Sequence, residues 1–133
     1  MKKYKKIIFI FLAAILFIGG AFAAKYFFDL NNYREAVEKI TIGEVNLVTI
    51  PDGTYTGSSE TMWVGATVEV TVRDHRITVI KLDHRHGQGE AAEVITDHVI
   101  EAQSLQVDII SGVTSSSKVI LKAIENALLS ATE

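Results

Sequence analysis

A run of hydroxyl side chains near the carboxyl end carries the clearest potential for chemistry. Residues 108–117 read DIISGVTSSS: one acid, then Ser-Gly, a small apolar residue and four consecutive hydroxyl residues. A Ser or Thr at a helix start accepts a hydrogen bond from a first-turn backbone N–H, and one such cap is sufficient. Four in succession lower helix propensity. Either the run caps a helix, or one hydroxyl is an attachment point for a ligand.

The second interpretation follows from the helix that this run precedes. Its apolar stripe predicts a helix from Ser115 onward, with the face Val119, Ile120, Ala123, Ile124, Ala127 and Leu128. A helix start presents free N–H groups and a positive dipole end, so it binds phosphate well. A phosphate on Thr114 would meet the amides of residues 115–117, and Gly112 would let the backbone approach a ligand closely.

The segments that position this helix alternate between strand and helix periods. Strict alternation over 67–72, followed by the turn RDHR and a return strand ITVIKL at 77–82, predicts an antiparallel hairpin. Shorter apolar patterns predict strands over 45–50 and 105–110, and a helical stripe covers 91–102. This order predicts an α+β domain, in which a small antiparallel sheet packs with helices.

The amino-terminal segment is apolar enough to cross a membrane. Residues 7–24 form 18 positions without a charge, and such a helix spans about 27 Å, close to a bilayer's hydrocarbon core. A basic cluster that remains cytoplasmic precedes it, formed by Lys2, Lys3, Lys5 and Lys6. Everything after Ala24 is therefore expected outside the cytoplasm. The alternative is a cleaved signal peptide, since AFA at 21–23 resembles a cleavage site, but the apolar run exceeds the usual ~7–15 residues.

The chain after Ala24 is acidic. Four of the 13 Lys and Arg residues precede residue 25, which leaves nine against 16 Asp and Glu residues and a net charge of −7. An acidic surface repels phosphate backbones, so nucleic acid is not an expected partner. The sequence contains no cysteine, which excludes disulfides, thiolate metal sites and lipoprotein acylation.

The hydroxyl run also resembles the signature of a known family. DIISGVTSS is similar to the Asp-x-x-Ser/Thr-Gly-Ala-Thr-x-Ser attachment motif of FMN-binding domains. These occur in extracytoplasmic subunits of sodium-pumping NADH:quinone oxidoreductases and in related electron-transfer proteins. The resemblance covers roughly residues 50–129 and includes three further stretches: DGTYTGSSE at 52–60, TVEVTVRDHRI at 67–77 and the chain from 86 to 128.

The resemblance implies a covalent cofactor. In this family a flavin transferase uses FAD and magnesium to join FMN by a phosphoester to the signature threonine, which corresponds to Thr114. Asp108, Ser111 and Gly112 correspond to the recognition residues of the signature. The sequence departs from the family at Val113, where alanine is usual; valine is larger and could crowd the transferase or the flavin.

Other residues are implied less directly. By the same resemblance, Ser115 and Ser116 would surround the phosphate. The loop DHRHGQG at 83–89 corresponds to one near the flavin ring, where Gly87 and Gly89 would allow close approach of the isoalloxazine. The same loop places His84 and His86 two residues apart, on one side of a strand, as in a zinc site, but the sequence supplies no third ligand.

Three segments are therefore predicted. Residues 1–24 are the basic tail and membrane anchor or signal peptide, 25–44 a helical stalk or linker, and 45–133 the FMN-binding domain.

The expected protein is a single-pass flavoprotein in the cell membrane, with the domain on the extracytoplasmic side. By resemblance, its partners are the flavin transferase, the lipid bilayer, a membrane quinone-linked electron donor and an extracytoplasmic acceptor. It would be an electron-transfer protein or oxidoreductase subunit rather than a stand-alone enzyme. The alternative is a non-covalent flavin or ligand sensor, or an accessory subunit of a membrane complex.

Overall fold

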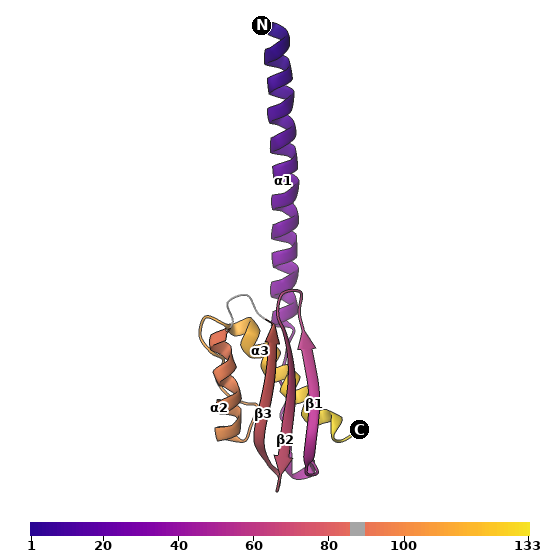
Figure 1. The fold of residues 1–133 in the computed structure, drawn as a ribbon, viewed down its shortest axis with the longest axis vertical. Coiled ribbons are helices and arrows are strands. Elements are labelled where there is room, and N and C mark those ends of the chain that lie inside the picture. The colour runs from indigo at the N-terminus through magenta and orange to yellow at the C-terminus, as the bar shows by residue number, and fades with distance from the viewer. Residues whose placement is uncertain (86–89) are drawn as a thin grey trace. The chain divides into compact units, whose positions relative to one another are not determined.

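The computed structural model describes residues 1–85 and 90–133 and divides the chain into two compact units (Figure 1). The first unit is Met1–Glu35 and the second is Ala36–Glu133. Helix α1, Lys2–Glu38, forms the first unit and contributes its last turn to the second. By length and composition α1 could cross a membrane. Its most apolar stretch of 18 residues has no residue buried within the protein. The helical stalk predicted over 25–44 is part of α1 as far as Glu38.

The second unit is built on an antiparallel three-stranded sheet. Its strands are β1 (Gly53–Glu60), β2 (Gly65–Arg73) and β3 (Arg76–Arg85), in that spatial order. Helix α3, Thr114–Ser130, crosses one face of the sheet over β1 and β2, and α2, Ile95–Ala102, lies beside β3 (Figure 1). A 3-10 helix over Glu90–Val94 leads into α2. This arrangement confirms the predicted α+β fold.

The core lies between the sheet and the helices. Alternate residues of β2 are fully buried, as their period-two pattern predicts: Val68, Val70 and Val72. The helices contribute one apolar face each, with Ile95 and Val99 from α2 and the predicted stripe of α3 from Val119 to Leu128. The alternate residues of β2 that face away from the core are mostly polar. The apolar face of the strand is therefore the one on which α3 packs.

Two predicted strands are wrong. Residues 45–50 contain a 3-10 helix over Leu47–Thr49, because Asn46 Oδ1 accepts the N–H of Val48 at 3.1 Å and turns the chain locally. In this segment only Ile50 is buried. Residues 105–110 run without strand pairing. Their alternating pattern pairs with no strand of the described sheet, and the backbone of Ile77 on β3 is bonded instead to a glutamine side chain.

That glutamine, Gln103, ends α2 in a left-handed conformation with φ 51°. Its Oε1 accepts the N–H of Ile77 at 2.7 Å, and its Nε2 donates to the carbonyls of Ile77 at 2.8 Å and Ile100 at 2.6 Å. These bonds fall where β3 bulges, because Val72 pairs with Ile77 while Thr71 pairs with Val79. The side chain thus satisfies the strand edge and fixes α2 to β3.

Replacing Gln103 with alanine should lower the free energy of unfolding by about 2–3 kcal/mol, since it leaves half-buried backbone groups of β3 unsatisfied. Urea unfolding of the full chain in mild detergent measures this cost. Gln106→Ala is the matched control. Gln106 Nε2 bonds two carbonyls at 3.3 Å in an exposed position, and its loss should cost under about 1 kcal/mol. An equal loss of unfolding free energy in the two variants would contradict the role of Gln103 in satisfying the backbone of β3.

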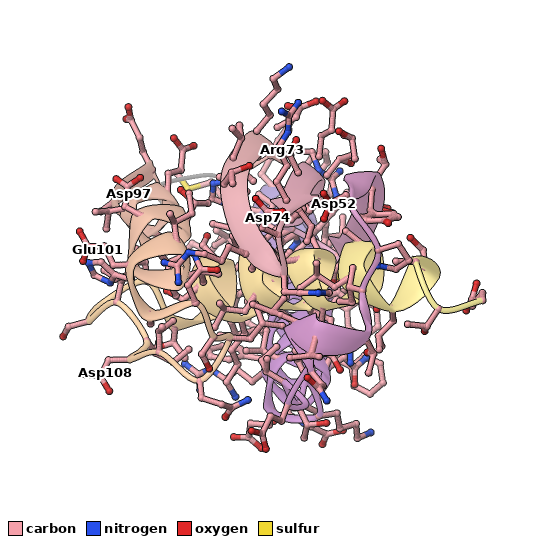
Figure 2. All side chains as sticks on the ribbon, turned by 90° about the horizontal axis from the view of Figure 1, so that it is seen from below. Asp52, Arg73, Asp74, Asp97, Glu101 and Asp108 are labelled. Carbon is pink, nitrogen blue, oxygen red and sulfur yellow. The ribbon has the colours of Figure 1, made fainter. Side chains whose placement is uncertain are left out.

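The β2–β3 connection is a two-residue turn between the paired residues Arg73 and Arg76. Asp74 and His75 both have positive φ, 50° and 62°, which is the type I′ geometry that matches strand twist. The N–H of Asp74 also donates to Asp52 Oδ1 at 2.9 Å, and Figure 2 shows these two residues together at the sheet end.

His75→Gly should raise the free energy of unfolding by about 0.5–1 kcal/mol, because histidine pays for the left-handed conformation and glycine does not. A thermal melt of the full chain should show a midpoint a few degrees higher, given roughly 4–8 °C per kcal/mol for a domain of this size. Thr67→Gly, at an exposed position inside β2, should instead lower the midpoint. A lower midpoint for His75→Gly would refute the turn assignment.

Candidate functional site

The predicted attachment region begins with a tight turn. The N–H of Val113 donates to the carbonyl of Ile110 at 3.2 Å, which closes a four-residue turn around Ser111 and Gly112. Gly112 has φ +81°, and a Cβ placed there would meet nothing within 4 Å. Backbone conformation, rather than lack of space, therefore requires glycine here. Ser111 and Gly112 are both exposed on the outside of the turn.

Ser117 locks this turn to α3. Its Oγ accepts the N–H of Ile110 at 3.2 Å and donates to the carbonyl of Val113 at 2.9 Å, and the residue is fully buried. The N–H of Ser117 also bonds the Val113 carbonyl at 3.0 Å. The fourth hydroxyl of the run is therefore structural, a role that sequence reasoning missed. The signal that could have found it is its spacing, one helical turn after the residue at which the chain enters α3.

Helix α3 begins at Thr114, one residue earlier than predicted, and its N-cap residue is Val113. Valine has no side-chain acceptor, and the first turn contains no acidic residue. Among the described residues, no side chain accepts a hydrogen bond from the N–H groups of Thr114, Ser115 or Ser116. The hydroxyl run does not cap the helix, so the capping interpretation is wrong. Within the described residues, the first turn of α3 therefore has neither a side-chain cap nor an acidic residue of its own to offset the positive end of the helix dipole.

Burial separates the four hydroxyl residues of the run. Thr114 is exposed and Ser115 is half-buried, whereas Ser116 is 4% exposed and Ser117 is 0% exposed. Thr114 Oγ is thus the hydroxyl of this run that a large reagent can reach most easily. A phosphate joined to it would lie at an uncapped helix start, which is the environment that stabilises phosphate. The residues present fit the phosphate end of FMN.

Asp108 lies apart from this turn. It is exposed and points away from the domain, on the same side as Asp97 and Glu101 of α2 (Figure 2). It also borders an open surface cleft between the end of α2 and the segment before α3, lined by His98, Glu101, Ala102, Gln106 and Val107. Within the described part of the chain, Asp108 makes no hydrogen bond to the turn at 110–113. The arrangement leaves this carboxylate exposed at the surface rather than using it to build the turn.

The second predicted contact region is only partly described. Gly87, Gly89 and His86 lie outside the described residues. Just before them, His84 of β3 has a fully buried side chain whose Nδ1 lies 3.3 Å from Glu93 Oε1. This contact joins the end of β3 to the 3-10 helix before α2. In residues 1–85 and 90–133, no three His, Asp or Glu side chains are grouped as a metal site.

Comparison with known proteins identifies the domain. The family model described as the FMN-binding domain matches residues 57–129, from the middle of β1 to the last turn of α3. No curated protein and no solved structure gives a match. The matched range covers more than half of the chain and includes the turn, the exposed threonine and the uncapped start of α3. The chain belongs to the FMN-binding domain family.

Proposed function

We propose that this chain is a single-span membrane flavoprotein that carries FMN on Thr114 through a phosphoester and transfers electrons outside the cytoplasm. One observation carries the proposal. Within a domain of the FMN-binding family, α3 begins with an exposed threonine and an uncapped first turn. The other hydroxyls of the run are less accessible, and Ser117 is occupied by structural hydrogen bonds.

The attachment step follows from this geometry. Thr114 Oγ would form a bond to the FMN-side phosphorus of FAD, while the pyrophosphate P–O bond breaks. AMP leaves, and the hydroxyl proton is released with it. A flavin transferase with magnesium would catalyse this transfer. The N–H groups at the start of α3 would then face the new phosphodiester, whose single negative charge complements the helix dipole.

The exposure of Thr114 favours a covalent bond over reversible binding. Pockets that hold cofactors reversibly bury most of the ligand surface. Thr114 and the neighbouring residues Ser111 and Gly112 are exposed, so they offer little burial to the phosphate end of a cofactor. A covalent bond would retain the flavin without such burial, and it would prevent loss of the cofactor outside the cell.

The charges that flank α1 support an extracytoplasmic orientation of the domain. The four lysines before the apolar part of α1 would remain cytoplasmic, which would put the FMN-binding domain on the other side. The flavin would supply the redox chemistry. The partners implied are the lipid bilayer, a membrane quinone-linked donor and an extracytoplasmic acceptor. The net charge of −7 after Ala24 would keep this part of the chain from lying on an anionic lipid surface.

Intact-mass measurement of the full chain tests this proposal. The chain should be expressed with and without an active flavin transferase, whose activity is verified on another substrate. With the transferase, the mass should rise by one FMN less one water, and the denatured band should fluoresce in a gel. Flavin that is lost on unfolding would indicate the non-covalent sensor instead. No mass gain would show that this sequence, with Val113 in its motif, is not a substrate.

A further inference from the structure

The exposed side of α3 carries two cations in line with Thr114. Lys118 and Lys122 follow Thr114 at intervals of four residues, and side chains four residues apart lie on the same helix face. Long side chains on a helix lean toward its amino terminus, so Lys118 is the cation able to reach a group on Thr114. Both lysines belong to the compact unit Ala36–Glu133.

The two lysines differ in their electrostatic partners. Lys122 Nζ lies 2.8 Å from Glu125 Oε2 and also donates to the carbonyl of Thr41 at 3.2 Å. Lys118 Nζ donates to the carbonyl of Val37 at 3.4 Å, which is a long bond to a neutral acceptor. In the part of the chain that the structure describes, Lys118 forms no ion pair. It is a half-buried cation with no counter-charge bonded to it among the described residues, in a region whose net charge is −7.

We propose that Lys118 is the counter-ion of the phosphate attached to Thr114, an inference that rests on the proposed function. The phosphate would lie between the Lys118 ammonium and the free N–H groups of the first turn of α3. A phosphate oxygen is a stronger acceptor for an ammonium than a peptide carbonyl at 3.4 Å. Lys118 therefore exchanges its bond to Val37 for one to the phosphate when FMN is attached.

This exchange predicts a stability gain on attachment that depends on Lys118. The thermal midpoint of the full chain should be measured in detergent, bare and flavinylated, for wild type, Lys118→Met, Lys118→Arg and Lys122→Met. The gain on attachment should be smaller by roughly 4–8 °C in Lys118→Met than in wild type, and it should shrink in high salt. Lys118→Arg should keep most of the gain, and Lys122→Met should keep all of it.

A purely structural role gives a different result. If Lys118 acts only through Val37, Lys118→Met lowers the bare and flavinylated midpoints equally and leaves the gain unchanged. That result would overturn the proposal. The phosphorus resonance of the attached group gives a direct readout, since it should move in Lys118→Met and stay in place in Lys122→Met. A resonance that is the same in all variants would also overturn it.

The remaining outcomes are also decisive. If Lys118→Met takes up no FMN while Lys118→Arg and Lys122→Met do, the cation is needed at this position and the proposal is supported. If wild type takes up FMN but the gain is independent of Lys118, the counter-ion proposal fails and the proposed function stands. If wild type takes up no FMN from an active transferase, the proposed function fails and the counter-ion proposal falls with it.

Discussion

The Thr114→Ala chain is expected to acquire no covalent FMN when it is expressed with an active flavin transferase. The substitution removes the hydroxyl that would form the phosphoester. The next residues do not replace it, because Ser115 is half-buried, Ser116 is nearly buried and Ser117 is bonded to the turn before α3. The intact mass should lack the added FMN, and the denatured protein should show no flavin fluorescence. The loss should be complete rather than graded.

Matched variants separate chemistry from folding in this experiment. Thr114 is exposed and makes no hydrogen bond with another described side chain, so Thr114→Ala should change the unfolding free energy by less than about 0.5 kcal/mol. Thr114→Ser keeps a hydroxyl and should still accept FMN, at a lower rate. Ser115→Ala should accept FMN as wild type does. A mass gain in Thr114→Ala that disappears in Ser115→Ala would reassign the attachment site to Ser115.

Periodicity was sufficient for the elements that form the core. The alternation of Val68, Val70 and Val72 and the apolar stripe of α3 each require one buried face, so the β2–β3 hairpin and α3 follow from the pattern, whereas β1 was not predicted from it. The failures at 45–50 and 105–110 have different causes. In the first segment the Asn46 side chain turns the backbone into a 3-10 helix, and in the second the local pattern does not encode whether a neighbouring strand is available.

The candidate site was predictable in location but not in the roles of its residues. The apolar stripe after the hydroxyl run predicted a helix from Ser115, and α3 begins within one residue of that position. Sequence could not separate exposed Thr114 from buried Ser117, because burial depends on how the turn folds back on the helix. Nor could it reveal the contact of Lys118 with Val37, which joins residues 81 positions apart.

Gly57→Ala is expected to destabilise the domain by about 3 kcal/mol or more. Gly57 lies in the middle of β1, where α3 crosses the strand. A Cβ at this position would overlap the backbone of Ala123 and Ala127, and it would lie 2.7 Å from Ala127 Cα. Backbone atoms of a helix cannot rotate away as a side chain can, so all of α3 must shift. Because α3 begins with Thr114, this variant should also take up FMN poorly.

Gly65→Ala is the matched control, because it makes the same chemical change in the same sheet. A Cβ at Gly65 would lie 3.3 Å from Glu60 Cγ and 3.4 Å from an Arg85 nitrogen, both in flexible side chains that can move aside. Its cost should stay below about 1 kcal/mol. Urea unfolding of the full chain, followed by the fluorescence of its single tryptophan, Trp63, compares the two variants. If the two substitutions lower the free energy of unfolding by similar amounts, strand propensity would explain both effects. Close contact with α3 would then not be the reason for glycine at Gly57.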